Sequence, residues 1–401
     1  MKTLIKNGII VTPLRMIKQG AILIKNGKIA NIFEKLPQKK WGYEVEIVDA
    51  KGCYITPGFI DIHCHGGGGF DFLDDDFRAI HKASQTHMQY GTTSIVPTVM
   101  TSSLEVILRS LDHFKKAKQQ LFSAPHLLGI HLEGPYLSAE RKGAQPEYFI
   151  KKPDPVECQH LLDYSNDIIR WTIAPEIPGA LTLGRMLKDR NILVSIGHTQ
   201  AEYQDIVKAY ENGFSHFTHF YSAMSGVHKK KAFRYAGAVE AGYLIDEITL
   251  EIIADGRHLP APLLKLILKI KGPDKVCLIT DAMRAAGMPP GEYVLGNQKE
   301  GQKVIIEDEV AKLKDRSALA GSIATANRLL RNIMQLADAN LKDAVKMLTL
   351  TPARIIGIAD HKGILAPGKD ADVVVFNDQI DIQLVMVNGQ IKINHFGYFS
   401  E

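Results

Sequence analysis

The middle of the chain alternates between short apolar runs and amphipathic stretches with helical spacing. The apolar runs predict eight strands, at Thr56–Ile62, Ser94–Thr98, Leu127–Leu132, Ile169–Ala174, Leu193–Gly197, Phe214–Thr218, Thr249–Ala254 and Lys275–Thr280. Helices are predicted at 76–89, 103–118, 155–164, 179–190, 202–211, 260–270 and 323–338. Apolar strands that alternate with helices favour a parallel sheet covered on both faces. Eight such units predict an α/β fold, a (β/α)8 TIM-type barrel.

Both ends of the chain have a different pattern, typical of short β-strands. Residues 1–56 contain β-branched and apolar runs separated by Gly, Pro and Asn-Gly, and residues 363–401 repeat this texture. Because chain termini often lie close together, we predict one small β-sandwich domain formed from 1–56 and 363–401. The barrel, residues 57–362, is then inserted between its halves. Asn7-Gly8 and Asn26-Gly27 are predicted hairpin turns.

Charge and cysteine content narrow the classes of function. The chain has 48 Lys and Arg against 44 Asp and Glu, a net charge of +4, which argues against a global basic field for nucleic acid. Its four cysteines form no C-x-x-C and are too few for a disulfide scaffold. No apolar run reaches the ~18 residues of a membrane span, and charges interrupt any signal-peptide core at the start. We expect a cytoplasmic protein without nucleic-acid or membrane partners.

The predicted strands end in imidazoles and carboxylates. In a barrel, the active site lies at the carboxyl ends of the strands. Six candidates stand at five of these ends: His63, His65, Glu133, His198, His219 and Asp281. The two-residue spacing of His63 and His65 places both rings on one face of a strand. Imidazoles and carboxylates without thiolates predict a hydrolytic site for a divalent ion such as Zn, Fe or Mn.

Two of the six carboxylates and imidazoles have further interpretations. Asp281 is the expected general base, which takes a proton from water and returns it to a leaving amine. Glu133, at the end of a buried strand, needs a compensating partner. A metal ion supplies one, and a salt bridge with Arg141 or Lys142 is the alternative.

Several neighbouring residues have a structural and a functional interpretation. His131 and His216 lie close to the candidate ligands and are expected to support them or fill the core. Cys64 is expected in the core. The run Gly66–Gly69 permits a tight loop and, alternatively, an anion cradle. The basic run His228–Lys231 is either a solvated face or, on a loop at the barrel mouth, a contact for an anionic substrate group.

These residues lie within motifs that resemble the amidohydrolase superfamily and, within it, the N-acetylglucosamine-6-phosphate deacetylases. The motifs are the segments 57–66, 131–136, 142–145, 197–199, 218–224, 254–258, 280–282, 319–322 and 368–372. H-L-E-G-P together with T-H-x-Y-x-A-M is the most specific pair. Strand 171–176 offers no Lys, whereas other superfamily members bridge two metals with a carboxylated Lys there.

The resemblance implies a metal-dependent enzyme that removes the N-acetyl group of N-acetylglucosamine 6-phosphate. Glu133, His198 and His219 would hold the main ion, and His63 and His65 a second one bridged by Glu133. Asp281 would be the catalytic residue and a further metal contact. The implied substrate-binding residues are Ala144, Gln145, Ser222, Ala223, His228, Lys230, Asp255, Gly256, Arg257, His258, Leu319, Ala320 and Gly321. The family also implies a homodimer and a role in amino-sugar catabolism.

Two positions depart from the family pattern. Ser222 stands where the family usually has Asn. Lys230 stands at the spacing of an Arg that contacts the phosphate across the dimer interface, and Arg234 is a possible substitute. Lys binds phosphate as a point charge and not bidentately. The substrate alternatives are therefore N-acetylgalactosamine 6-phosphate or another N-acyl amide, and the remote alternative is a scaffold without activity.

Overall fold

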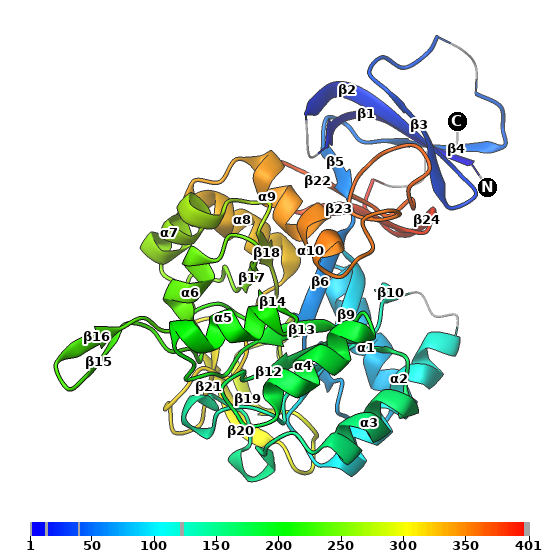
Figure 1. The fold of residues 1–401 in the computed structure, drawn as a ribbon. Coiled ribbons are helices and arrows are strands. Elements are labelled where there is room, and N and C mark those ends of the chain that lie inside the picture. The colour runs from blue at the N-terminus through cyan, green and yellow to red at the C-terminus, as the bar shows by residue number, and fades with distance from the viewer. Residues whose placement is uncertain (1, 13–14, 39–40, 121–123, 397–401) are drawn as a thin grey trace.

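The computed structural model describes residues 2–12, 15–38, 41–120 and 124–396, and Figure 1 shows their two parts. A barrel of strands and helices forms the larger part. A mixed sheet, which carries both chain ends, packs against one end of it. Within these described ranges, no helix is both long and apolar enough to cross a membrane.

The barrel is nearly closed and consists of eight parallel strands in the order β6-β9-β11-β12-β13-β14-β17-β18. Between its last and first strands, the Asp281 N–H donates to His63 O at 2.9 Å. The prediction of a (β/α)8 barrel is confirmed, with strand ends shifted by a few residues. The strands are β6 (Phe59–Cys64), β9 (Thr92–Met100), β11 (Ile130–Glu133), β12 (Ile168–Ile173), β13 (Leu193–Ile196), β14 (Phe214–Phe217), β17 (Thr249–Ile252) and β18 (Val276–Leu278).

Helices cover the outside of the barrel (Figure 1). Side chains that accept from first-turn N–H groups fix several starts, such as Asp76, Ser103 and Asp154. All seven predicted helices occur, and three short ones were not predicted: α6 (Ala238–Leu244), α9 (Leu341–Leu348) and α10 (Leu350–Ile355). The predicted ones are α1 (Phe77–Met88), α2 (Leu104–Gln119), α3 (Pro155–Tyr164), α4 (Ala180–Asp189), α5 (Tyr203–Glu211), α7 (Ala261–Lys271) and α8 (Ala326–Ala337).

Strands from both chain ends form one mixed sheet in the order β24-β23-β22-β5-β1-β2-β3, with β4 paired to β1. The predicted union of the two ends is thereby confirmed. The boundaries at 56/57 and 362/363 stay a prediction, and residues 1, 13–14, 39–40 and 397–401 of that domain lie outside the described residues. The strands are β1 (Lys2–Val11), β2 (Met16–Lys25), β3 (Lys28–Phe33), β4 (Val45–Asp49), β5 (Tyr54–Pro57), β22 (Val373–Phe376), β23 (Ile382–Val387) and β24 (Gln390–Asn394).

One predicted turn in this sheet is wrong. Asn26-Gly27 does form the turn between β2 and β3, whereas β1 runs through Asn7-Gly8. Asn7 has a positive φ of 58°, and the register with β2 shifts on both sides of Gly8. The dipeptide therefore makes an irregularity within a long strand, where the Asn7 amide also donates to Asp49 Oδ2 at 2.7 Å.

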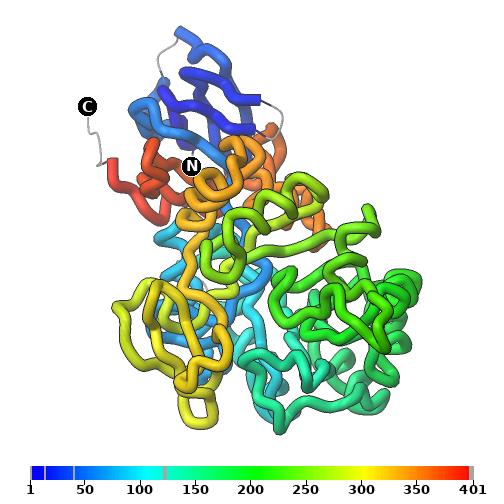
Figure 2. Tube along the Cα trace, turned by 90° about the vertical axis from the view of Figure 1, so that its left-hand side faces the viewer, coloured from blue at the N-terminus to red at the C-terminus, as the bar shows by residue number. Residues whose placement is uncertain are grey.

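Two antiparallel insertions follow barrel strands, one after β14 and the other after β18. A hairpin of β15 (His228–Lys230) and β16 (Phe233–Tyr235) projects from the body in Figure 1. A three-stranded sheet follows β18 and forms the yellow lobe in Figure 2, at the opposite end from the mixed sheet. Its strands are β19 (Gly291–Leu295), β20 (Gln302–Glu307) and β21 (Val310–Leu313). Smaller elements are β7 (Gly66–Gly67), β8 (Phe70–Asp71), β10 (His126–Leu127), η1 (Ala139–Arg141) and η2 (Glu147–Phe149).

Candidate active site

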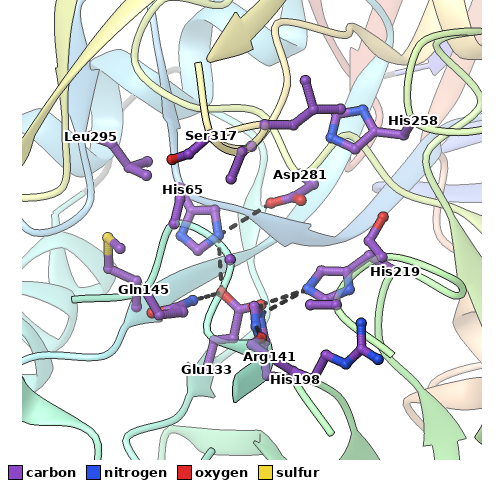
Figure 3. Close-up of a pocket in the computed structure, with 18 of the residues that line it drawn as sticks. His65, Glu133, Arg141, Gln145, His198, His219, His258, Asp281, Leu295 and Ser317 are labelled. Atoms are coloured by element: carbon purple, nitrogen blue, oxygen red, sulfur yellow. Dashed lines mark hydrogen bonds and ion pairs between the residues drawn. The ribbon is translucent and has the colours of Figure 1, made fainter. Parts of the chain in front are cut away.

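The structure brings the six predicted metal and catalytic residues into one cluster. They extend from the carboxyl ends of β6, β11, β13, β14 and β18. Figure 3 shows five of them gathered around one point. They are His63, His65, Glu133, His198, His219 and Asp281, and all six are buried. The donor atoms form two groups, one of His63, His65 and Asp281 and the other of Glu133, His198 and His219.

Distances within the two groups fit metal coordination. His63 Nε2 and His65 Nε2 are 3.3 Å apart, and His65 Nε2 is 3.2 Å from Asp281 Oδ1. In the other group, Glu133 Oε1 lies 3.2 Å from His198 Nε2 and 3.0 Å from His219 Nε2. Bonds of about 2.0–2.1 Å place the donors of a tetrahedral zinc site roughly 3.3 Å apart. Both groups therefore have the spacing of a coordination shell.

Glu133 joins the two groups. Its Oε1 faces the His198–His219 pair, whereas its Oε2 lies 3.3 Å from His65 Nε2. The Gln145 amide also donates to Oε2 at 2.7 Å. The alternative salt bridge does not form, because Lys142 pairs with Glu147 and the described polar contacts of the Glu133 carboxylate are to imidazoles and Gln145.

Electrostatics keep both carboxylates in the form that binds cations. Burial alone would raise the pKa of Glu133, but His63 and the hydrogen bonds from His198 and His219 hold that pKa well below its usual range. The pKa of Asp281 is likewise lowered, since His63 and His65 outweigh its burial. Burial lowers the pKa of His63, yet Asp281, Glu251 and Glu133 raise it to about 9. The cluster thus attracts positive charge to its centre.

Three of the candidate ligands sit on strained backbone just beyond their strands. His198, His219 and Asp281 have φ values of 49°, 29° and 45°. Left-handed φ is uncommon for residues other than Gly and concentrates at functional sites. Hydrogen bonds stabilise the conformation: the His198 Nδ1 faces Arg141 O at 2.8 Å, and the His219 N–H donates to Glu251 Oε1 at 3.1 Å.

A cavity of about 440 Å³ opens above the cluster. This volume is in the range of small-molecule sites. Seven of the predicted substrate-binding residues line it: Ala144, Gln145, Ser222, Ala223, His258, Leu319 and Gly321. At Gly321 the φ of 65° and a Cβ position 2.9 Å from Asp281 O both require glycine.

The other predicted substrate-binding residues do not line the cavity of the same chain. His228 and Lys230 lie on the β15–β16 hairpin, where both contact Glu202. Arg257 is exposed and pairs with Glu309 at 3.2 Å. Gly256 and Ala320 also stand outside the lining, Ala320 being fully buried.

Asp255 lies beneath His258 and orients its ring. His258 Nδ1 is 2.8 Å from Asp255 Oδ2, and the backbone N–H groups of Arg257 and His258 donate to Asp255 Oδ1. Burial would raise the pKa of Asp255, but the His258 hydrogen bond lowers it, so a carboxylate accepts from Nδ1–H. Only Nε2 of His258 is then left for a ligand in the cavity.

The residues with two interpretations take structural positions. His131 lies between Thr98 Oγ1 at 3.1 Å and Thr172 Oγ1 at 2.7 Å, and burial with Arg170 lowers its pKa well below the usual value. His216 contacts Glu251. Cys64 is buried against His87, with its Sγ 3.2 Å from Nε2. The run Gly66–Gly69 forms the tight β7–β8 hairpin.

Sequence reasoning missed several residues of the site. Arg141 lines the cavity, although it was considered only as a partner of Glu133. Leu295, Ser317 and Ala318 come from the unpredicted three-stranded insertion and the loop after it. Glu251 contacts candidate ligands of both groups from inside a strand. The sequence feature that could have identified Glu251 is its charge within an otherwise apolar run.

Comparisons with known proteins show which family this chain resembles. The amidohydrolase family profile matches residues 54–392. An N-acetylglucosamine-6-phosphate deacetylase of Bacillus subtilis is 35% identical, over 97% of this chain and 96% of the relative. An N-acetylgalactosamine-6-phosphate deacetylase of Escherichia coli O157:H7 is 33% identical, over 92% of this chain and 93% of the relative.

A solved structure has the same fold throughout. It is a mutant of the Mycobacterium smegmatis N-acetyl-D-glucosamine-6-phosphate deacetylase in complex with N-acetyl-D-glucosamine-6-phosphate. It is 28% identical to this chain, with a TM-score of 0.88 over 98% of this chain and 99% of the other. The chain belongs to the amidohydrolase family. Within that family it is an enzyme of the N-acetylglucosamine-6-phosphate deacetylase type.

Proposed function

We propose that the enzyme hydrolyses the N-acetyl group of N-acetylglucosamine 6-phosphate in amino-sugar catabolism, giving glucosamine 6-phosphate and acetate. One observation carries the proposal. Two histidine–carboxylate groups, between which Glu133 makes contact, lie at the base of a cavity whose described lining contains a single permanent cation, Arg141. This combination suits an amide at the cluster and an anionic group farther out.

Glu133, His198 and His219 would hold the main ion, and His63 and His65 with Asp281 a second one. The donor set of imidazoles and carboxylates fits Zn, Fe or Mn, and we propose one or two ions per chain. When bound, a divalent ion polarises the carbonyl group and makes water a stronger acid.

Asp281 performs the proton transfers in this proposal. Its lowered pKa leaves it as a carboxylate at neutral pH, and Oδ1 points into the cluster beside His63 and His65. It accepts a proton as water attacks the acetyl carbon. The same proton is then delivered to the amine nitrogen, the C–N bond breaks, and acetate leaves.

His258 orients the sugar. Because Nδ1–H donates a hydrogen bond to Asp255, Nε2 is the ring nitrogen that faces the cavity wall, where it would accept a hydrogen bond. A sugar hydroxyl supplies the matching donor. Ala144, Gln145, Ser222, Ala223 and the Leu319–Gly321 segment shape the remaining wall.

Arg141 meets the phosphate. Its Nε is buried without a hydrogen-bond partner, and no described carboxylate lies within ion-pair distance of the guanidinium. An unpaired buried donor of this kind costs free energy unless a ligand satisfies it. A guanidinium binds phosphate with strong, directional hydrogen bonds.

We propose that a second copy of the chain supplies a further cation. The β15–β16 hairpin projects from the body and exposes Val227 and Phe233, and it carries Lys230 and Arg234. A homodimer in which this hairpin reaches the partner's cavity would account for both its apolar residues and its charge. Sedimentation of the wild type, and of Phe233→Ser, tests the dimer.

A second substrate has support from one comparison. The Escherichia coli relative named for N-acetylgalactosamine 6-phosphate is almost as similar as the relative from Bacillus subtilis. The two sugars differ only in the orientation of one hydroxyl. N-acetylgalactosamine 6-phosphate is therefore the alternative substrate.

The test is acetate release from both 6-phosphates and from unphosphorylated N-acetylglucosamine. We expect the highest kcat/KM for N-acetylglucosamine 6-phosphate. A higher value for the galactose isomer would assign the alternative substrate. Equal values for the phosphorylated and unphosphorylated sugars would contradict the phosphate contact.

A further inference from the structure

A buried ion pair lies inside the barrel, directly below the metal candidates. Arg170 on β12 and Glu251 on β17 have no solvent exposure, and Arg170 Nη1 donates to Glu251 Oε2 at 2.5 Å. A buried pair of this kind is often no more stabilising than apolar residues of similar volume. Fold stability alone therefore does not explain its presence.

The two oxygens of Glu251 have separate partners. Oε1 lies 2.7 Å from His63 Nδ1 and accepts from the His219 backbone N–H at 3.1 Å. Oε2 binds Arg170 and lies 3.3 Å from His216 Nε2. A single oxygen thus contacts one residue from each of the two histidine–carboxylate groups.

The contact with Oε1 determines which ring nitrogen of His63 presents a lone pair to the cluster. A carboxylate oxygen only accepts, so His63 Nδ1 must carry a proton. In the neutral ring, Nε2 is then the free acceptor, and it is the nitrogen 3.3 Å from His65 Nε2. Hydrogen bonds of this type to the far nitrogen of a ligating histidine fix its tautomer and orientation.

Arg170 in turn fixes Glu251. Its guanidinium also donates to Ser195 Oγ at 3.0 Å, Ile62 O at 3.0 Å and Thr218 Oγ1 at 2.9 Å. These contacts anchor it to β13, to β6 and to the residue that follows β14. The cation holds Oε2, which leaves Oε1 to His63 Nδ1 and the His219 N–H.

We propose that Arg170 and Glu251 are positioning residues that hold the His63 ring in the tautomer, and the His219 backbone in the conformation, required for metal binding. The inference rests on the proposed metal site and is independent of the sugar. The residues would act through the two histidines and touch neither substrate nor ion.

The test uses Glu251→Gln alone and combined with Arg170→Met. In the single variant, the amide oxygen turns to the Arg170 cation, because charge-assisted hydrogen bonds are about twice as strong as neutral ones. The amide NH₂ then faces His63 Nδ1, which must become an acceptor. Nε2 carries the proton and loses its capacity to bind a metal ion.

The double variant reverses this orientation. Without the cation, the amide oxygen can return to His63 and the His219 N–H. The NH₂ group can donate to His216 Nε2, whose Nδ1 faces Thr249 Oγ1 at 2.7 Å. Metal binding should therefore recover, although two charges have been removed. A merely structural role predicts that the double variant is at least as impaired as the single one.

The measurement is metal retained per chain against increasing chelator, with circular dichroism as the check on folding. We expect Glu251→Gln to release metal at chelator concentrations about 10- to 100-fold lower than the wild type. The double variant should recover most of this loss. His216→Gln is the matched control, because it changes a partner of Glu251 Oε2 and leaves Oε1 on His63, so it should retain metal like the wild type.

The inference would be overturned if folded Glu251→Gln retained as much metal as the wild type. It would also be overturned if the double variant retained no more metal than the single variant. If the single variant does not fold, the double variant decides: retention near the wild-type level supports the inference and a loss of metal overturns it. A wild type that binds no metal would refute the proposed metal site itself.

Discussion

Replacing Arg141 by Gln tests how the enzyme recognises an anionic substrate. The guanidinium lines the cavity, and its Nε is buried without a partner, so the substitution breaks no described ion pair within the protein. Only the backbone carbonyl of Arg141 contacts His198, at 2.8 Å from Nδ1, and that group is retained in the variant. Any activity lost in Arg141→Gln should therefore come from weaker substrate binding.

A hydrogen bond to a charged group contributes about 1.5–3 kcal/mol. Its loss corresponds to a decrease of about 10- to 150-fold in kcat/KM. We expect this decrease for N-acetylglucosamine 6-phosphate, and almost no change for the slower reaction of unphosphorylated N-acetylglucosamine. Acetate release measured with both substrates gives the two ratios, and metal content should remain at the wild-type level.

Lys142→Gln is the matched control. Lys142 is the next residue along the chain, but it lies outside the cavity lining and pairs with the exposed Glu147. Exposed pairs contribute little, so we expect a change of less than about threefold. Equal losses on both substrates in Arg141→Gln, or no loss on either, would refute the assignment of Arg141 to the phosphate.

Three further substitutions probe the proton transfer, the backbone at the site and the contact between the two parts of the molecule. Asp281→Asn should lower kcat by about 10²- to 10⁴-fold or more while the ion held by the Glu133 group remains, and wild-type turnover would contradict its role. Gly321→Ala should destabilise the fold by about 1 kcal/mol or more and reduce kcat, because its φ of 65° and the nearby Asp281 O leave no room for a Cβ; an unchanged Tm and kcat would refute this. Asp372 is buried, which raises its pKa, but His126 and Lys362 lower that pKa to about 2. Its contribution to stability, about 2 kcal/mol, is therefore present above pH 4 and is lost as the pH falls toward 2. The free energy of unfolding in urea should be lower for Asp372→Asn than for the wild type by this amount at pH 7, and the difference should shrink below pH 4. A difference independent of pH would argue against the ionised pair.

The barrel could be predicted because its strands are apolar runs that end in polar residues. The same rule located the metal candidates, since a parallel barrel brings all carboxyl strand ends to one mouth. His63 and His65 needed only the two-residue period of a strand. Tertiary structure determines how far the group of His63, His65 and Asp281 lies from the group of Glu133, His198 and His219. It also determines that Glu133 lies between them.

Residues inside the strands were harder to predict. Arg170 and Glu251 stand within apolar runs, so the rule that site residues follow strand ends does not identify them. A charged residue in the middle of a buried strand requires a partner, which is a signal that sequence alone contains. Which partner it finds cannot be predicted, because β12 and β17 are separated by two other strands in the barrel.

The cavity wall was missed for a different reason. Leu295 and Ser317 belong to an insertion whose strands pair only with one another, so the barrel pattern does not imply it. The short helices α6, α9 and α10 contain too few turns for a periodic pattern to predict them. Lys230 lies on a projecting hairpin outside the cavity lining, and the spacing of its motif does not predict that position.

We propose a metal-dependent deacetylation of an amino-sugar 6-phosphate. Its most direct test is acetate release from N-acetylglucosamine 6-phosphate by protein stripped with a chelator and then reconstituted with Zn, Fe(II) or Mn. We predict negligible turnover without metal and recovery with at least one of these ions, in proportion to the metal bound. Full turnover by the metal-free protein, or no acetate release with any of the three ions, would contradict the claim.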